Sequence, residues 1–412
     1  MISFYEAEEK INNLAGKINP SIISLNLMDA IGCTLAEDIY TDIDMPPFNY
    51  SAMDGFAIKY SPDVSSWQYA GEITAGHFQN FNIDENQAIS IMTGSKIPAA
   101  ADTVIPIEHV EVKRNRINLI NKPDGENLTG KNDIIIGKNV RYAAEDLALG
   151  EIAVKSGAIL THNNIAAAAA CGKNIVKVLG KLKIAVFSTG DELIPISEKP
   201  TADKIRNTNL YTLISALKQI GMDPLNYGII QDDKEYLNYK ISEILNSGID
   251  FLITTGGVSV GKHDYLPEIF ENIDCERIFW KVNIKPGKPI LFNVYKFKDR
   301  LIPVFSLPGN PVSCFVNFEI FIRPMINKIY RKEEYRIFSA ILTKDLTKND
   351  KKTHFKNGKF YYDRNSNRYL VECLLGNSSG DLISLGNSNC LVIIPENQSN
   401  IKAGENVECI RI

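Results

Sequence analysis

The sequence has few of the residues from which metal or disulfide frameworks are built. Its seven cysteines are widely scattered, no CxxC pair occurs, and only five histidines are present. A structural zinc site or a disulfide network requires these residues at closer spacing. The pattern therefore favours free, buried thiols in a reducing compartment.

The sequence also lacks a long apolar run and an excess of one charge. Its longest apolar stretch, residues 165–171, is far shorter than the roughly 20 residues that span a bilayer. The mixed, acidic N-terminus is unlike a signal peptide. A formal net charge of −4 provides no general attraction to nucleic acid or anionic lipid. We therefore expect a cytoplasmic protein with no nucleic-acid or membrane partner, which captures anions through local basic groups.

Hydrophobic periodicity divides the 412 residues into segments of different character. Residues 3–17 have helical spacing, with Ser3 as N-cap and Glu6 three residues further on. Residues 30–39 are predicted to form a second helix, and residues 163–171 a third that ends at Gly172. Residues 42–155 contain short alternating runs separated by Gly, Pro and Asn turns, which indicates a β-rich insert.

Residues 183–330 alternate between strand and helix patterns. Strands are predicted at 184–188, 226–230, 251–255, 278–282, 290–295 and 302–305, and helices at 210–220, 236–245, 264–272 and 311–330. This alternation predicts a doubly wound α/β domain. Residues 335–412 return to short strands with polar turns and are predicted to form a small β domain.

Acidic, hydroxyl and glycine residues follow three strands of the α/β pattern. They are Thr189, Gly190 and Glu192 after the first strand, Asp232 after the second, and Gly256, Gly257, Ser259 and Asp264 after the third. Ligands of open α/β sheets bind beyond the carboxyl ends of the strands. One Asp after a strand is usually a helix cap or turn residue, but three acidic turns at one edge suit Mg²⁺ bound together with substrate phosphates.

Residues 256–262 fit the GxxxxGK pattern of a P-loop. His263 stands where that motif requires Ser or Thr, and the glycines follow the third strand of the domain, not the first. We therefore reject an NTPase. The simpler interpretation is that Gly256 and Gly257 let the backbone approach a ligand closely.

Basic residues surround a Pro-Gly turn further along the chain. Lys281, Lys285 and Lys288 form either a solvated basic loop or a cationic wall for an oxyanion, and prolines at 286 and 289 stiffen the loop. A second turn contains Gly309, Asn310 and Ser313 and begins a helix, whose free backbone N–H groups would face an anion.

Seven segments of the chain together resemble the molybdopterin molybdenumtransferase family, which includes the E domain of gephyrin. They are MPPFNYSAMDGFAI (45–58), MTGSKIPAAADTVIPIE (92–108), VRYAAED (140–146), FSTGDEL (187–193), TTGGVSVGKHDY (254–265), WKVNIKPGKP (280–289) and SLPGNPVS (306–313). A weaker match is LLGNSSGDLISLGNSNCLVII (374–394). These matches follow the family order over nearly the whole chain.

The resemblance implies an enzyme that inserts molybdenum from molybdate into the dithiolene of adenylylated molybdopterin, with Mg²⁺-dependent release of AMP. It implies a multidomain α/β plus β fold: an elongated N-terminal domain (1–41 with 147–178), an inserted β-rich domain (42–146), an α/β molybdopterin-binding domain (179–330) and a small C-terminal β-barrel (331–412). It also implies a homodimer in which the insert of one subunit faces the α/β site of the other. The upstream adenylyltransferase and downstream molybdoenzyme chaperones are candidate protein partners.

The resemblance assigns roles to individual residues. Asp54 and Thr93 would approach from the insert, and Arg141 and Asp146 would lie near the hinge. Glu192, Asp232 and Asp264 would surround the cation and phosphate, Lys281 and Lys285 would meet molybdate or the pterin phosphate, and Ser378 and Ser379 would contribute from the C-terminal domain. In this mechanism the substrate's sulfurs bind molybdenum, so no protein cysteine cluster is needed.

Two residues depart from the family pattern. Ala100 and Ala144 each stand where the family has glycine. If either backbone has a positive φ angle, an alanine there would be strained by about 1 kcal/mol or more.

Two other functions share parts of this pattern. The adenylyltransferase of the preceding step has the α/β domain but is compact, and the additional segments of this chain argue against it. A scaffold like the receptor-clustering gephyrin E domain would have a long linker or a second module, and none is recognised here. Side-chain identity does not distinguish molybdate from tungstate, because the two oxyanions are so similar in size.

Overall fold

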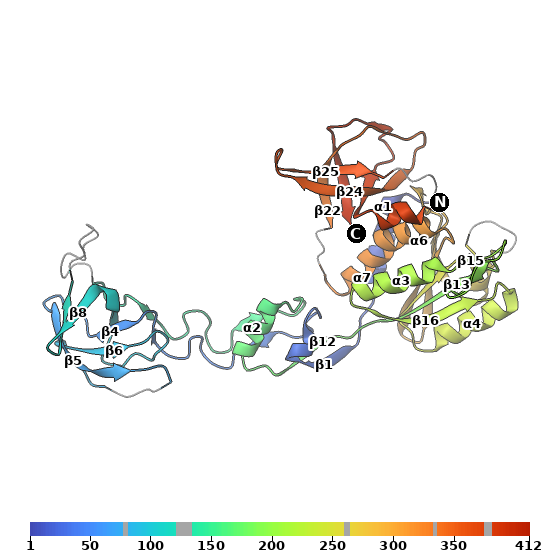
Figure 1. Cartoon of the computed structure of the whole chain (residues 1–412). Coiled ribbons are helices and arrows are strands. Elements are labelled where there is room, and N and C mark those ends of the chain that lie inside the picture. The colour runs from blue at the N-terminus through green and yellow to red at the C-terminus, as the bar shows by residue number, and fades with distance from the viewer. Residues whose placement is uncertain (77–80, 121–133, 259–263, 333–335, 375–380) are drawn as a thin grey trace. The chain divides into compact units, whose positions relative to one another are not determined.

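The computed structural model describes residues 1–76, 81–120, 134–258, 264–332, 336–374 and 381–412 (Figure 1). The chain divides into two compact units. The first comprises Met1–Ser24, Gly32–Ala36 and Lys177–Ile412, and the second comprises Leu25–Ile31 and Glu37–Val176. The boundaries between the units fall within β1 (Ile22–Asn26), on both sides of Gly32–Ala36, and within β12 (Ile175–Leu179). No helix in the described ranges combines the length and apolarity needed to cross a membrane.

The first unit contains a six-stranded sheet in the order β16-β13-β17-β21-β20-β18. Its strands are β13 (Lys183–Thr189), β16 (Asp223–Ile230), β17 (Phe251–Thr255), β18 (Glu276–Trp280), β20 (Leu291–Phe297) and β21 (Arg300–Leu307). Strands β16, β13, β17 and β21 are parallel. At one edge β20 pairs antiparallel with β21, and β18 pairs antiparallel with β20. A short parallel pair, β14 (Leu193–Ile194) and β15 (Ile205–Arg206), follows β13.

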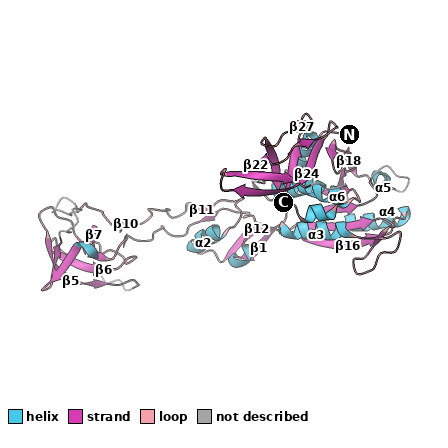
Figure 2. Ribbon diagram, turned by 45° about the horizontal axis from the view of Figure 1, so that its top comes forward, coloured by secondary structure: helices cyan, strands magenta, loops and turns pink. Residues whose placement is uncertain are grey.

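Helices cover both faces of this sheet (Figures 1 and 2). Ile184 and Val186 of β13 belong to a core shared with α1 (Phe4–Ala15), α3 (Thr208–Gln219), α6 (Pro311–Asn317) and α7 (Arg323–Ile329). Ala185 and Phe187 belong to a second core with α4 (Lys234–Asn246) and α5 (Leu266–Asn272). Because alternate residues of a strand point to opposite faces, the predicted doubly wound arrangement is confirmed.

Local capping explains where several helices begin and end. Ser3 accepts a hydrogen bond from the Glu6 backbone N–H and Glu6 bonds back to Ser3, so the predicted capping box of α1 is confirmed. Helix α2 (His162–Ala170) lies in the second unit and ends before Gly172, which has φ of 71°. The predicted helix at 311–330 is present, but a π-helical turn at Phe318–Ile322 joins α6 to α7.

The C-terminal part of the first unit is a closed five-stranded barrel. Strands pair in the order β24-β25-β22-β28-β26, and β26 pairs again with β24. These strands are β22 (Ile337–Leu342), β24 (Thr353–Asp363), β25 (Arg368–Cys373), β26 (Cys390–Ile394) and β28 (Asn406–Arg411), accompanied by β23 (Leu346–Thr347), β27 (Asn400–Ile401) and α8 (Leu382–Gly386). Strand β19 (Ile284–Lys285) adds to β24 in parallel, so a loop of the α/β domain is tied to the barrel.

The second unit is mainly β-structure. Its sheet has the order β7-β4-β6-β5-β9-β8 and consists of β4 (Gly55–Ile58), β5 (Ser66–Ile73), β6 (Gln87–Ile91), β7 (Thr103–Pro106), β8 (Val110–Lys113) and β9 (Arg116–Leu119). The pairs β3 (Tyr50–Ser51) with β10 (Val140–Arg141) and β2 (Ile39–Tyr40) with β11 (Ile152–Val154) complete the unit, with 3₁₀ turns at Leu27–Ala30 and Ile107–His109. The predicted β-rich insert is confirmed.

One predicted element was wrong, and one predicted strand ends earlier than expected. Residues 30–39 do not form a helix, because the 3₁₀ turn ends at Ala30, Gly32 has φ of 76°, and Leu35 forms an extended bridge with Val178. The strand predicted at 278–282 ends at Trp280, because Lys281 has φ of 68°, outside the extended region.

Candidate functional site

Four parallel strands of the α/β sheet end at one edge. The register pairs Thr189 at the end of β13 with Ile230, and Thr255 at the end of β17 with Leu307. Ser188 is paired with Thr255, which places the four strand ends side by side. The turns that follow these strands therefore meet at one edge, as a parallel sheet requires.

Asp232 interacts with the other acidic turns at this edge. The Thr189 hydroxyl donates a hydrogen bond to its Oδ1 at 3.1 Å. Burial raises the pKa of Asp232, and the Thr189 hydrogen bond opposes this rise. The negative charges of Asp191, Glu192 and Asp264 raise the same pKa further. The structure thus brings Glu192 and Asp264, the other two predicted cation ligands, within electrostatic range of Asp232.

The donor set fits a magnesium ion that takes several ligands from substrate and water. In the ranges that the structure describes, which omit 259–263, no three Asp, Glu, His or Cys side chains converge to hold a metal ion by themselves. Magnesium is usually held by one or two carboxylates together with phosphate oxygens. A bound cation would favour the ionised form of Asp232, whose pKa its acidic neighbours raise.

The glycines of the third turn are required by contacts inside the protein. Gly256 and Gly257 have φ of 92° and 63°. A Cβ atom on Gly256 would lie 2.0 Å from the carbonyl oxygen of Thr189. Gly309 lies nearby, since a Cβ there would be 3.9 Å from the Gly256 Cα. The close approach seen here is between two turns of the sheet edge, and close approach to a ligand stays a prediction.

A buried polar network that the sequence did not reveal lies at this edge. Thr255 donates to Ser188 at 3.0 Å, and Ser188 donates to Asn207 Oδ1 at 3.1 Å. Asn207 also caps α3 by accepting from the backbone N–H of Leu210. Asn209 donates to the Gly309 carbonyl at 2.8 Å. Asparagine before a helix is a common cap, so its connection to the site could be found only in three dimensions.

Lys281 is linked to the glycine turn through Trp280. The indole N–H of Trp280 donates to the carbonyl of Val258 at 3.2 Å, and the Lys281 ammonium lies 4.4 Å from the centre of the Trp280 ring. Lys281 adopts φ of 68°, a region that costs a non-glycine residue energy and is frequent at functional sites. Trp280 thus joins the turn after β17 to the first lysine of the basic segment.

Lys285 has a different environment. It lies in β19, and its ammonium is 3.7 Å from Asp350 Oδ2 of the C-terminal segment. Lys288 contributes backbone contacts, because its carbonyl accepts hydrogen bonds from the N–H groups of Val282 and Ile290. The structure therefore links Lys281 to the turn after β17 through Trp280, and pairs Lys285 with the barrel.

The last predicted turn of the α/β domain begins α6. Asn310 is the N-cap residue, Pro311 occupies the first helical position, and Ser313 is buried in the first turn of the helix.

Gly190 lies in the turn that follows β13. It has φ of 148°, and a Cβ there would lie 2.7 Å from the Glu192 carboxylate oxygens. Ser259, Ser378 and Ser379 lie outside the described residues.

The remaining predicted residues form two pairs in the second unit. Asp54 Oδ1 accepts hydrogen bonds from the N–H of Thr93 at 2.7 Å and from its hydroxyl at 2.8 Å, and these bonds lower the pKa of Asp54. Arg141 pairs with Asp146 and, at 3.1 Å, with Glu145, and these charges raise the pKa of Arg141. The local geometry of each pair fits polar groups held ready for a ligand.

The two alanines that replace family glycines have different backbones. Ala144 has φ of 59°, and its N–H donates to the carbonyl of Pro46 at 3.0 Å. Ala100 lies in a turn closed by the hydrogen bond from the Ala101 N–H to the Pro98 carbonyl, without a positive φ. The strain considered from the sequence therefore applies to Ala144 alone.

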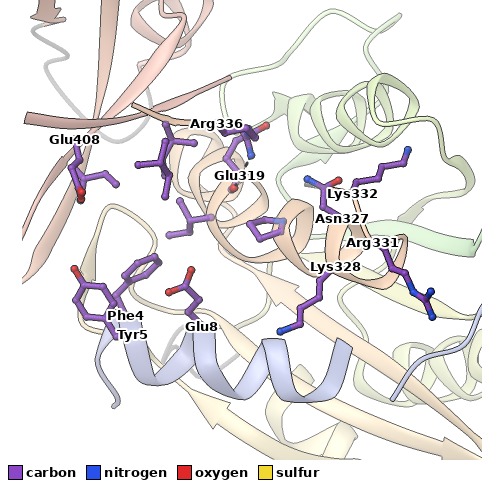
Figure 3. A pocket seen from close by; sticks show the side chains of 15 residues that line it. Phe4, Tyr5, Glu8, Glu319, Asn327, Lys328, Arg331, Lys332, Arg336 and Glu408 are labelled. Atoms are coloured by element: carbon purple, nitrogen blue, oxygen red, sulfur yellow. Dashed lines mark hydrogen bonds and ion pairs between the residues drawn. The ribbon is translucent and has the colours of Figure 1, made fainter. Parts of the chain in front are cut away.

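A cavity of about 510 Å³ lies elsewhere in the first unit, between α1, α7 and the barrel (Figure 3). None of its lining residues belongs to the turns at the sheet edge. Its wall contains Glu319, which is buried and pairs with Arg323 at 3.0 Å and with Arg336. Burial raises the pKa of Glu8 on another wall. This cavity therefore does not coincide with the residues that carry the predicted chemistry. The acidic and basic turns define the candidate site.

Sequence profiles of three known domains match the chain in order. The profile of the MoeA N-terminal region (domain I and II) matches residues 2–172. That of a probable molybdopterin binding domain matches 185–328, and that of the MoeA C-terminal region (domain IV) matches 339–412.

Known proteins are similar over nearly the whole length. A molybdopterin molybdenumtransferase of Haemophilus influenzae is 32% identical over 388 residues, which cover 93% of this chain and 92% of that protein. One of Staphylococcus epidermidis is 31% identical over 418 residues, covering 99% and 95%. The crystal structure of the molybdopterin biosynthesis MoeA protein of Pyrococcus horikoshii OT3 matches with a TM-score of 0.81 and 27% identity, covering 100% of both chains.

Proposed function

Because the chain belongs to the MoeA family of molybdenum cofactor biosynthesis proteins, we propose that it inserts molybdenum from molybdate into adenylylated molybdopterin and releases AMP. The observation that carries this proposal is the sheet edge, where burial and the charges of nearby carboxylates raise the pKa of Asp232. Trp280 joins the same edge to the basic segment. An acidic site next to a basic one suits a phosphate-bound cation beside an oxyanion.

The acidic turns would hold Mg²⁺. Asp232, Glu192 and Asp264 supply hard oxygen donors, and the ion would polarise the phosphoanhydride from which AMP departs. The first turns of the edge, with Thr189 and Gly190, and the start of α6, with Asn310 and Ser313, would bind the nucleotide and pterin phosphates. Gly256, Gly257 and Gly309 shape the backbone of the same edge.

The basic segment would bind the oxyanions. Lys281 and Lys285 would meet molybdate or the pterin phosphate, and Lys288 would add positive charge. Protein thiols would take no part. All but Cys33 of the seven free cysteines are buried, and burial raises the pKa of Cys275 and Cys373 to about 12. Soft ligands for molybdenum would then come from the substrate.

We further propose a cytoplasmic homodimer in which Asp54, Thr93, Arg141 and Asp146 of one subunit complete the site of the other. The four domains would have the boundaries 1–41 with 147–178, 42–146, 179–330 and 331–412. The preceding adenylyltransferase and later chaperones are proposed transient partners, because the substrate must arrive and the product leave without losing the metal.

The test is release of AMP. Purified protein is incubated with adenylylated molybdopterin, Mg²⁺ and molybdate, and AMP is followed by chromatography. We expect molybdate-stimulated release, which Asp264→Ala and Lys285→Ala abolish while the oligomeric state in solution is retained. Absence of molybdate-stimulated release from folded wild-type protein would refute the proposal, and wild-type turnover by either variant would show that the site is misplaced.

A further inference from the structure

The barrel supplies an acidic partner to a lysine of the candidate site. Asp350 Oδ2 lies 3.7 Å from the Lys285 ammonium, and strand β19, which carries Lys285, pairs with β24 of the barrel. Asn283 reinforces the junction by donating to the Lys351 carbonyl at 2.8 Å and accepting from the Thr353 N–H. The backbone on both sides of the pair is therefore held in place.

His354 fixes the other oxygen of this carboxylate. Its Nε2 lies 2.7 Å from Asp350 Oδ1, and its side chain is buried. Burial lowers the pKa of His354, so the neutral ring donates this hydrogen bond. The Lys352 N–H donates to the same Oδ1 at 3.2 Å. Burial alone would raise the pKa of Asp350, but the hydrogen bonds from His354 and the Lys352 N–H and the charge of Lys285 lower it, so the group is a carboxylate at neutral pH.

The two partners differ in mobility. The Asp350 side chain is held by two donors, whereas the Lys285 side chain is 60% exposed. Exposed ion pairs are weak, and lysine can swing its ammonium between partners at low cost. An arriving oxyanion would therefore compete with Asp350 for the same ammonium.

We infer that Asp350 is a positioning counter-ion for Lys285. Asp350 pairs with the Lys285 ammonium when no anion is bound, and the ammonium leaves this carboxylate to contact the oxyanion when one binds. This inference rests on the proposed function, in which Lys285 binds an oxyanion. The oxyanion is either molybdate or the pterin phosphate, and both would be repelled by the Asp350 carboxylate. Asp350 thus limits how tightly the site binds its anion.

The test is Asp350→Asn in the full-length protein. Asparagine keeps an acceptor for His354 and removes the charge. We expect KM for molybdate, or KM for adenylylated molybdopterin, to fall about threefold without a rise in kcat, because one negative charge near the anion is lost. The KM that falls identifies the oxyanion at Lys285. The difference from wild type should shrink at high salt, and Asp350→Glu should restore the wild-type KM.

The matched control is Asp345→Asn, which removes the same charge from the same barrel. Asp345 is exposed and pairs with Lys402 at 2.8 Å, whereas Lys285 pairs with Asp350. We expect both KM values to stay at the wild-type level. An equal fall in Asp345→Asn would overturn the inference, because the effect would then arise from net charge.

A double-mutant cycle separates this inference from the proposed function. Because loss of Lys285 is expected to abolish turnover, the cycle is measured as Kd by isothermal titration with molybdate and with adenylylated molybdopterin. If Asp350 acts through Lys285, adding Asp350→Asn to Lys285→Gln changes neither Kd further. If Asp350→Asn strengthens anion binding as much in the Lys285→Gln background as in wild type, or has no effect in wild type, the inference is overturned while the proposed function stands. If Lys285→Gln by itself leaves both KM values and kcat unchanged, the proposed role of Lys285 fails. Isothermal titration with molybdate alone measures the affinity change without turnover.

Discussion

Replacing Ala144 by glycine tests whether its left-handed backbone is strained. Ala144 has φ of 59°, where an L-residue costs roughly 1–2 kcal/mol. Glycine removes that cost, but its greater conformational freedom in the unfolded chain destabilises the folded state by about 0.4–1 kcal/mol. The expected net result is stabilisation by about 0.5–1 kcal/mol.

Ala100→Gly is the matched control. Ala100 has no positive φ, so the substitution relieves nothing and should destabilise by about 0.4–1 kcal/mol. The two variants make the same chemical change in the same unit, and a stabilising Ala144→Gly is accounted for only by relief of the left-handed backbone. The Ala100 methyl also packs against the core of the insert, which adds to the destabilisation expected for Ala100→Gly. Their expected separation is about 1–2 kcal/mol.

Tryptophan fluorescence provides the assay. The chain has two tryptophans, with Trp67 fully buried in the second unit, which contains both alanines, and Trp280 in the first. In a Trp280→Phe background, urea unfolding followed by fluorescence therefore reports the second unit alone. With a slope of about 2 kcal/mol/M, 1 kcal/mol shifts the midpoint by about 0.5 M. If Ala144→Gly unfolds at or below the parent midpoint, the strain argument is refuted.

The structure leads to five further predictions. Asp232→Asn should reduce AMP release by about 100-fold or more, because metal polarisation supplies several kcal/mol. The same variant should be more stable than wild type at pH 7, because the pKa of Asp232 is raised in the folded state and its ionised form therefore destabilises the fold above that pKa. The difference in stability should disappear below about pH 4, where Asp232 of the wild type is protonated in both the folded and the unfolded state. Urea unfolding of both proteins at the two pH values measures this. Gly256→Ala should destabilise by about 3 kcal/mol or more, given the 2.0 Å approach to Thr189, whereas Gly309→Ala, with its nearest atom at 3.9 Å, should be tolerated; thermal unfolding distinguishes them. EDTA should abolish AMP release and added Mg²⁺ should restore it, and activity that survives chelation would remove the metal from the mechanism. A thiol reagent should label Cys33 rapidly and the six buried cysteines only after denaturation, which mass spectrometry of labelled peptides can follow.

Hydrophobic periodicity in the sequence was sufficient to predict the helices and strands that bury one regular face. The helices and parallel strands of residues 183–330 were predicted within a few residues, and the capping box of α1 is present as expected. Predictions were wrong where one backbone angle decides the outcome. Gly32 and Lys281 both adopt positive φ, and a pattern of apolar residues carries no information about such angles.

The sequence by itself determined the composition of the site and the order of its parts. Acidic turns after strands, glycines at tight turns and a lysine segment are local features, and the sheet's parallel direction brings the turns to one edge. Only the tertiary structure decided which partner each group has. Asp232 has a raised pKa because it is partly buried and three other carboxylates lie near it. Lys285 pairs with Asp350, 65 residues away in sequence (350 − 285), because β19 joins the barrel. Electrostatic interactions depend on distance in space and on burial, and both are set by how the chain packs.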